Sequence, residues 1–453
     1  MNARRRFLRA ASVLAAGSAL AAGSRGRGGR EWRDYDFRPY RRGETLGPTH
    51  IVTPPGGYFV NTYYDVDPWS PSGRYLALTE LPYQDAVTVL GDRAWVVVVD
   101  LARRRYRRVA TTRMWGYQMG AILHWGAGDD ELFAHDVAPD GRGVGVRIDL
   151  RRDRVTPLAG PLYDVDPAGR TGIGPNLERL NHTQYAYGTP TVRADPSAFP
   201  ALAPGADPEE GVWETDLDTG ARRLLIPLPA LAEAGGAHAR LRGCGYTVFH
   251  VKYSPDKRHI LVVLRCSRPR GEGPSPRNPQ LLVARRDGTA LREVLSLERW
   301  SRGGHHPTWR PDGEGIVMNL TDPRGDETLR FCSLDRRGAG FAVLSDAFVG
   351  SGHPSLDPTG RWLLADAYPS EPMANAAGEV PIRLLDLAAG REHCVARVFT
   401  DVGRALPGSR FWGPPKLDAH PAWNATYDRV CFNGAPTGER AVLLTDLSDF
   451  FDA

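Results

Sequence analysis

The ten residues WSPSGRYLAL (69–78) contain the pattern that decides the fold of this chain. An aromatic residue is followed by a polar residue, Pro, a small residue, Gly and a base, and then by alternating apolar residues. Pro and Gly favour a tight turn, and the apolar alternation is typical of a β-strand. The pattern recurs six more times, the last two in degenerate form: VDPAGRTGIG from Val165, YSPDKRHILVV from Tyr253, WRPDGEGIVMN from Trp309, LDPTGRWLLAD from Leu356, HWGAGDDELFA from His124 and AWNATYDRVCF from Ala422. The chain therefore repeats one turn-and-strand unit.

A second signature follows each turn and completes the repeat. It is an apolar strand that ends near Asp or Arg and leads into a polar turn, as in WVVVVDLARRR from Trp95 and IRLLDLAAG from Ile382. One such unit cannot bury both of its faces, whereas seven units around an axis can, and closure of the circle protects the strand edges. We therefore predict an all-β fold, a seven-bladed β-propeller over residues 59–453 with about four antiparallel strands in each blade.

Residues 1–22 (MNARRRFLRAASVLAAGSALAA) have the pattern of an export signal. A basic cluster precedes an apolar run, and ALA (19–21) fits the small-x-small site of signal peptidase. RRRFLR (4–9) resembles the twin-arginine motif. The sequence thus predicts export by the twin-arginine pathway to the periplasm or out of the cell, with residues 23–58 as a linker and N-terminal segment. An ordinary secretory signal and a retained anchor are the alternatives.

Composition excludes several other functions. The formal net charge is +4, but residues 1–22 hold four arginines and no acid, so the rest of the chain is close to neutral and gives no general case for nucleic-acid binding. Outside residues 1–22 no apolar run reaches the roughly 18 residues that span a bilayer, so we expect no stable membrane insertion after signal cleavage. The five cysteines form no C-x-x-C pair, and we expect buried thiols and a monomer. There is no G-x-S-x-G elbow and no P-loop.

Four histidines occupy one position in the repeats. Stepping back four residues from the first polar residue of each turn gives Val66, Ile122, Leu162, His250, His306, His353 and His420. The chain has only 12 histidines, so four in consecutive repeats are not expected by chance. Because equivalent positions in adjacent blades face a common axis, we predict that the imidazoles converge in the central channel. Convergent imidazoles suit a transition metal, or a uronate carboxylate if they are protonated. The structural alternative is that His-Pro is a packing device of the repeat.

Four further residues are candidates for a site near these histidines. Arg265 ends the strand that follows His250, and its charge suits an acidic ligand. His135, in FAHD, ends the corresponding strand of the second repeat. Tyr185 and Tyr187, in HTQYAYG, open the long insertion between the third and fourth repeats. A solvated strand end and packing at the rim are the respective alternatives.

The repeats WSPSGRYLAL, YSPDKRHILVV, HHPTWRPDGEGIVMN and GHPSLDPTGRWLLAD resemble those of secreted seven-bladed propeller polysaccharide lyases. The chain is most similar to the ulvan lyases and their rhamnose–glucuronate relatives, and more distantly to oligogalacturonate lyases, from about Phe59 to its end. The resemblance implies cleavage of an anionic polysaccharide or oligosaccharide next to a uronic acid by β-elimination. That chemistry needs a group that neutralises the carboxylate, a base that takes the C5 proton, and an acid that protonates the leaving oxygen.

The resemblance also implies roles for the histidines and Arg265. His250 would be the base or a substrate contact, and Arg265 the group that neutralises the carboxylate. The remaining members of the register would hold a divalent metal such as Zn²⁺, Mn²⁺ or Ca²⁺, or the carboxylate itself: His306, His353 and His420. No organic cofactor is expected.

The acid of the reaction is less well defined. His135 stands where the lyase group usually has Asn, and it is a candidate acid or base. Tyr187 is the candidate catalytic tyrosine, with Tyr185 and Tyr246 as alternatives. We expect Tyr185, Tyr246 and His305 to contact the substrate.

Two other classes of function remain open. One is a non-catalytic propeller that binds a glycan or a protein, and the other is a metal-dependent glycoside hydrolase on the same scaffold. The histidine register together with Arg265 favours an enzyme, because a binding module does not need so many titratable groups at one place.

Overall fold

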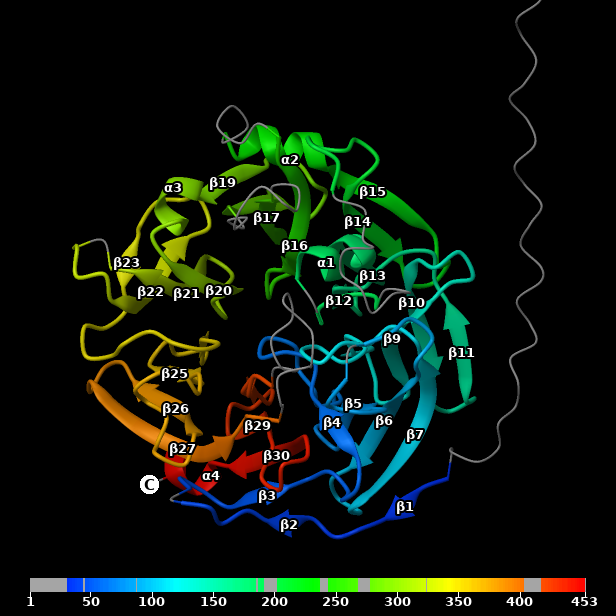
Figure 1. Ribbon diagram of the computed structural model, residues 1–453, viewed down its shortest axis with the longest axis vertical. Helices are drawn as coiled ribbons and strands as arrows, with labels where there is room; N and C mark the ends of the chain where they lie inside the picture. The colour runs from blue at the N-terminus through cyan, green and yellow to red at the C-terminus, as the bar shows by residue number, and fades with distance from the viewer. Residues whose placement is uncertain are drawn as a thin grey trace, which may run out of the picture.

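The computed structural model describes residues 31–43, 45–86, 88–184, 186–190, 202–236, 243–267, 278–322, 324–402 and 417–452. Seven antiparallel sheets of four or five strands stand around one axis (Figure 1). The predicted seven-bladed β-propeller is confirmed. In blades 2 to 6 the strands follow one another from the axis outward in chain order, and blade 1 differs only in its outermost strand, β1.

The first six blades have the following strands. Blade 1 consists of β4 (Tyr58–Val60), β5 (Tyr75–Leu81), β6 (Ala94–Asp100), β7 (Arg105–Thr112) and, outermost, β1 (Arg33–Asp34). Blade 2 consists of β8 (His124–Trp125), β9 (Glu131–Val137), β10 (Gly143–Asp149) and β11 (Arg154–Pro157). Blade 3 consists of β12 (Asp164–Asp166), β13 (Thr171–Gly174), β14 (Gly211–Asp216) and β15 (Arg222–Pro227). Blade 4 consists of β16 (Gly245–Tyr253), β17 (His259–Ser267), β18 (Pro279–Arg285) and β19 (Arg292–Leu295). Blade 5 consists of β20 (Gly304–Trp309), β21 (Gly315–Thr321), β22 (Leu329–Asp335) and β23 (Ala342–Val343). Blade 6 consists of β24 (Ser355–Leu356), β25 (Trp362–Ala365), β26 (Glu379–Asp386) and β27 (Arg391–Phe399).

Blade 7 joins the two ends of the chain. Its inner strands are β28 (Ala422–Trp423), β29 (Arg429–Gly434) and β30 (Ala441–Asp446), and its outer strands are β3 (Thr49–Ile51) and β2 (Arg38–Pro39). Thr49 lies opposite Thr445, and their hydroxyl oxygens are 2.8 Å apart. Residues within the predicted N-terminal segment 23–58 are therefore part of the sheets of blades 1 and 7, where they cover edges that would otherwise expose unpaired backbone groups.

Among the described residues, four short helices lie outside the sheets: α1 (Leu177–Thr183), α2 (Leu228–Ala234), α3 (Leu297–Trp300) and α4 (Ser448–Asp452). Helix α1 begins the long insertion between β13 and β14, and the Asn176 side chain caps it by accepting hydrogen bonds from the backbone N–H groups of Glu178 and Arg179. In the described part of the chain, no helix combines the length and apolar character needed to cross a bilayer.

The two sequence signatures of the repeat meet within a blade. The arginine of the turn pairs with the aspartate that ends the third strand, as in Arg74–Asp100 at 2.9 Å and Arg361–Asp386 at 2.6 Å. The Arg361 guanidinium holds the pKa of Asp386 at about 2. This contact explains why the motif requires a base after Gly and why the apolar strand stops at an acid.

A polar side chain near the end of the second strand connects five of the blades to the next blade. We call these residues the latch residues: Thr79, His135, Asn319, Asp366 and Asn433. Four of them accept a hydrogen bond from a backbone N–H: Thr79 from Ala121 (3.0 Å), His135 Nε2 from Leu162 (2.9 Å), Asp366 from His420 (3.3 Å) and Asn433 from Asn61 (2.9 Å). The fifth, Asn319, donates a hydrogen bond to the Gly352 carbonyl oxygen (2.9 Å). Each latch bonds the backbone where the next blade begins, and so sets the position of its innermost strand.

The latch residue of blade 2 leads to a prediction about stability and pH. His135 is buried, and its Nδ1 donates to the Ala121 carbonyl oxygen at 3.0 Å. Burial lowers its pKa from 6.5 to about 4. Between these two pH values the unfolded chain binds a proton that the folded chain does not. The free energy of unfolding therefore falls as the pH falls, by up to about 1.4 kcal/mol per pH unit from this group.

We expect His135→Gln to lower the free energy of unfolding at pH 8 and to flatten its pH dependence, as measured by urea unfolding from pH 4 to 8. His393→Gln, on the outermost strand β27, is the control. Equal slopes in wild type and His135→Gln would contradict this account.

Candidate active site on the propeller axis

The four histidines of the register lie together in the central channel. His250 is in β16 and His306 in β20, while His353 and His420 precede β24 and β28 by two residues. The rings of His306 and His353 are stacked with centroids 3.8 Å apart, and those of His353 and His420 are perpendicular at 4.4 Å. His250 stands on the other side of Tyr63, whose ring centroid is 5.6 Å from that of His250 and 4.6 Å from that of His420.

The backbone is adjusted to aim these side chains. His306 and His420 have φ values of 58° and 45°, in the left-handed region that non-glycine residues rarely occupy, and each is followed by proline. The register of β16 shifts between Val248 and His250, and that of β20 shifts between His305 and Thr308. Bulges and left-handed residues cost about 1–3 kcal/mol of local strain and concentrate at functional sites, where they redirect a side chain.

Two of the predicted metal ligands and one further carboxylate meet in a geometry that can hold a cation. One ligand atom from each of His353, Asp418 and His420 lies within 4.8 Å of the others, and all three residues are buried. Two imidazoles and a carboxylate are a donor set that Mn²⁺ and Zn²⁺ accept. His306, the third histidine predicted as a ligand, is stacked on His353, and its Nδ1 lies 2.7 Å from the Gly352 carbonyl oxygen.

Asp366 orients this group from behind. Its Oδ1 is 2.9 Å from His353 Nδ1 and 2.7 Å from the His353 backbone N–H, while Oδ2 accepts from the His420 N–H. When a carboxylate accepts a hydrogen bond from the Nδ1–H of a histidine, Nε2 is left as the atom that can bind a metal. Such a partner also raises the basicity of the histidine ligand. Full burial raises the pKa of Asp366, and the electrostatic interaction with His420 opposes that shift.

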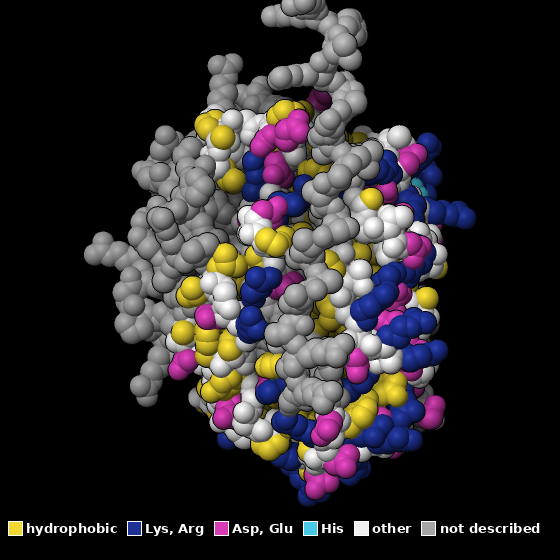
Figure 2. All heavy atoms as spheres, turned by 90° about the vertical axis from the view of Figure 1, so that its right-hand side faces the viewer, with side chains coloured by type: hydrophobic (Ala, Val, Ile, Leu, Met, Phe, Trp, Pro, Cys, Tyr) yellow, Lys and Arg dark blue, Asp and Glu magenta, His cyan; other side chains and the backbone are white. Residues whose placement is uncertain are grey.

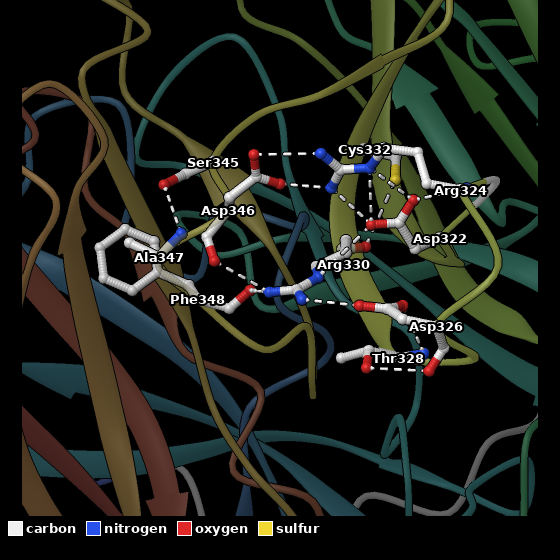
Figure 3. A network of polar contacts seen from close by, with 10 residues as sticks. All are labelled: Asp322, Arg324, Asp326, Thr328, Arg330, Cys332, Ser345, Asp346, Ala347 and Phe348. Carbon is white, nitrogen blue, oxygen red and sulfur yellow. Dashed lines mark hydrogen bonds and ion pairs between the residues drawn. The ribbon is translucent and has the colours of Figure 1, made fainter.

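The chain that leads to His353 is fixed by ion pairs of blade 5 (Figure 3). Arg324 lies between Asp322, at 2.5 Å, and Asp346. Arg330 pairs with Asp326 at 3.0 Å and donates to the backbone oxygen of Asp346 at 2.9 Å. The loop after β21 is thus tied to the loop before β24, which holds the segment in front of His353 in place.

His250 is kept neutral by its surroundings. It is 2% exposed, its Nδ1 is hydrogen-bonded to the Tyr163 hydroxyl, and its ring lies 3.9 Å from that of Phe249. Burial, followed by the positive charges of Lys252 and Arg265, lowers the pKa of His250 well below 6.5. A neutral imidazole can accept a proton, which is the property a general base needs.

A cavity of about 270 Å³ joins His250 to four of the other predicted site residues, whereas His353 and His420 are not among the residues that line it. Arg265, Tyr187, His305 and His306 line it, and Tyr368 and Asp418 complete the polar part of its wall. The Arg265 guanidinium lies 3.2 Å above the Phe249 ring and donates to Gln184, the C-cap of α1, at 3.2 Å. The long insertion and blade 4 therefore hold the positive charge at the cavity wall.

Beneath the histidines, a buried ion pair crosses the channel. Lys252 pairs with Asp65 and donates to the Pro307 carbonyl oxygen at 3.0 Å, and Asp65 also accepts from the Thr308 hydroxyl at 2.9 Å. The ammonium lies over the rings of Tyr63 and Tyr64, at 5.5 and 5.2 Å from their centroids. Blades 1, 4 and 5 are thereby connected at the axis.

Not every predicted site residue reaches this cavity. His135 is a latch residue with both ring nitrogens bonded to backbone, so the structure places it outside the cavity lining, because its position in the second strand faces the neighbouring blade and not the axis. Tyr246 is buried opposite Cys266 in the β16–β17 pair and does not line the cavity. Tyr185 lies outside the described residues.

The sequence analysis missed several groups that the fold brings to the axis. Tyr63, Tyr64 and Asp65 come from the first repeat, Tyr163 from the third, and Asp366 from the strand end of the sixth. Asp418 stands two residues before His420, so a search for acids near the histidine register would have found it. The tyrosines carry no signal in the repeat, because they lie in irregular segments between strands.

Loss of the Asp366 carboxylate is expected to weaken metal binding. Asp366→Asn removes the charge that orients His353 and keeps a side chain of the same size, so the affinity for Mn²⁺ should fall about 10–100-fold. Isothermal titration calorimetry of the metal-free protein measures this change. Asp357→Asn, in the β24–β25 turn of the same blade, is the control and should bind Mn²⁺ as wild type does. An unchanged affinity in Asp366→Asn would show that His353 does not depend on this carboxylate.

Comparison with known proteins identifies structural relatives but no sequence relatives. No family model matches the chain, and no curated protein matches its sequence. A solved structure described as oligogalacturonate lyase in complex with manganese is similar with a TM-score of 0.62 and 17% identity, over 94% of this chain and 100% of that one. An oligogalacturonate lyase from Vibrio parahaemolyticus gives a TM-score of 0.60 and 13% identity, over 93% and 100% of the two chains. The likeness shows that the chain has the propeller fold of these structures. The closer similarity to ulvan lyases stays a prediction.

Proposed function

We propose that this protein is a lyase that cleaves a uronate-containing oligosaccharide or polysaccharide by β-elimination. The observation that carries the proposal is the meeting of His250 and Arg265 in one cavity, beside the group of His353, Asp418 and His420. The two structural neighbours are oligogalacturonate lyases, which act on uronates as their name says, and one of them is a manganese complex. We extend the proposal to ulvan-type polymers from the sequence resemblance.

The residues can be assigned to the three roles of the reaction. Arg265 binds the uronate carboxylate and withdraws charge from it, which makes the C5 proton more acidic. His250 donates its Nδ1 proton to the Tyr163 oxygen, so that Nε2 has a lone pair and takes the C5 proton. The electron pair of that C–H bond forms the C4–C5 double bond, the C4–O bond breaks, and Tyr187 protonates the leaving oxygen.

Tyr187 receives the acid role from its position. It lines the cavity, and its ring centroid is 6.3 Å from that of His250 and 6.3 Å from that of Tyr63. His135, the other candidate acid, is held by backbone groups in the wall between blades 2 and 3. A divalent cation held by His353, Asp418 and His420 would supply additional positive charge for the carboxylate.

The test is the formation of the unsaturated uronate, followed by its ultraviolet absorbance. Purified protein loaded with Mn²⁺ is assayed on oligogalacturonates, ulvan, alginate and glycosaminoglycans. His250→Ala should lower kcat about 10²–10⁴-fold on the active substrate because it removes the base, and Arg265→Gln should lower kcat/KM about 10²–10³-fold because it removes the charge facing the carboxylate. His393→Ala, on β27 far from the channel in sequence and sheet order, should retain full activity.

Other outcomes of this assay identify the alternative functions. Release of reducing ends without absorbance would indicate a glycoside hydrolase. Saturable binding without any product would indicate a glycan-binding propeller. Full activity in His250→Ala would contradict the assignment of the base.

We propose further that the protein works outside the cytoplasm. The support is the twin-arginine pattern RRRFLR (4–9) followed by an apolar run, which lies outside the described residues. Replacing Arg4, Arg5 and Arg6 with lysine keeps the charge and removes the motif. Cell fractionation should then find the unprocessed chain in the cytoplasm, and unchanged export would indicate an ordinary secretory signal.

A further inference from the structure

A second cavity, of about 380 Å³, lies between the outer parts of blades 4 and 5. The side chains that line it include His259, Arg285, Arg292, Arg336 and Arg337, together with Val283 and two alanines. No carboxylate is among the residues of this wall. A concave surface with four guanidinium groups and one imidazole is therefore built into this side of the propeller.

The geometry of blade 4 places three of these groups on one face of its sheet. His259 lies directly opposite Arg285 in the β17–β18 pair, and Val283 lies directly opposite Arg292 in the β18–β19 pair. Residues that face each other across strands point to the same side, and so do residues two apart along a strand. Since Val283 and Arg285 are two apart on β18, all four side chains project from the same face.

The turn after β22 brings the other two arginines against that face. Gly338 has a φ of 80°, and a side-chain carbon at its position would lie 3.3 Å from the Glu293 oxygen and the Val294 Cα of β19. The turn therefore packs closely on blade 4. Arg336 is fixed further by Glu314, which accepts two hydrogen bonds from its guanidinium at 3.0 and 3.1 Å, and its Nη1 lies 3.2 Å from His259 Nε2.

The positive charges of this cavity are only partly compensated. Glu314 pairs with Arg336, but among the described residues no ion pair is formed by Arg285, Arg292 or Arg337. Burial, followed by the charge of Arg336, lowers the pKa of His259, while Asp256 and Glu314 oppose that shift. By contrast, the side of the molecule seen in Figure 2 shows basic and acidic side chains interspersed. Like charges held together without a counter-charge repel one another, and an anion between them removes that repulsion.

We propose that this cavity binds a tetrahedral oxyanion, the phosphate or sulfate group of a small ester or of a polymer. Guanidinium groups present paired donors that match the oxygens of such groups. The volume is at the lower end of the roughly 300–1,000 Å³ of small-molecule sites, which suits one compact ligand. The cavity shares no lining residue with the cavity of His250, so this site does not depend on the proposed lyase activity.

The test is calorimetric titration of the metal-loaded protein with inorganic phosphate and with inorganic sulfate, at constant ionic strength set with chloride. Arg292→Gln and Arg337→Gln should each weaken binding about tenfold or more, because each removes a charge-assisted hydrogen bond worth about 1.5–3 kcal/mol. Arg258→Gln is the matched control: its side chain is 80% exposed on the β16–β17 turn and is not part of the cavity wall. It should bind the anions as wild type does.

Several results would overturn the proposal. These are the absence of saturable binding in wild type, an equal loss in Arg258→Gln, and tighter binding of glucuronate than of phosphate or sulfate, which would indicate a carboxylate site. The rise of the melting temperature with added phosphate gives a second measurement for each variant. It also shows whether a variant that fails to bind is folded. Lyase activity should be unchanged in Arg292→Gln, which separates this site from the one on the axis.

Discussion

The hydrogen bond from a latch residue to the start of the next blade is the contact on which the site depends. A propeller blade packs on its neighbours mainly through apolar side chains. Such contacts fix the distance between two sheets well, but they fix the height of each sheet along the axis less well. A polar group that is buried must be paired, so the latch and the backbone group it binds allow only one register. Between blades 6 and 7 this contact sets the height of His420, because Asp366 accepts from its backbone N–H, and within blade 6 the same carboxylate also accepts from the backbone N–H of His353.

The axis shows the cost of collecting polar groups away from water. Three imidazoles, two carboxylates and a lysine are buried there, and burial of a charge is unfavourable unless it is paired. The fold meets this condition in two ways. Lys252 and Asp65 neutralise each other, and both form further hydrogen bonds with residues of blade 5. His250, in contrast, stays uncharged. A neutral imidazole beside a fixed cation is a suitable arrangement for removing a proton from a carbon next to a carboxylate.

The sequence was sufficient to predict the fold and the convergence of the histidine register on the axis. The repeat predicts seven blades, because a turn, a base and an apolar strand are local features, and the histidine register follows once the repeats are aligned. Tyr63, Tyr163 and Lys252 could not be predicted in this way, since they meet only when blades 1, 3 and 4 are closed around the axis. His135 lies outside the cavity lining for a related reason: it occupies the latch position of its repeat, as Asp366 and Asn433 do, and that position faces the next blade. The second cavity also depends on the packing of two blades.

The Lys252–Asp65 pair also lies between two separate cavities on the axis. The cavity of His250 is lined by the early parts of β16 and β20, whereas a separate cavity of about 280 Å³ is lined by the later parts of these strands and by the turns that follow them. The lining of this cavity of about 280 Å³ includes Lys252, Asp65, Tyr63 and Tyr64, which lie between it and the histidines. Under the proposed function, a saccharide would have to reach His250 from the side of α1 and Gln184, because the ion pair packed on two aromatic rings lies on the other side. Helix α1 begins the insertion between β13 and β14, and the described part of that insertion supplies Tyr187 and Gln184, the partner of Arg265. Under the proposed function, this irregular segment is therefore the part of the propeller that can vary with the substrate while the blades remain the same.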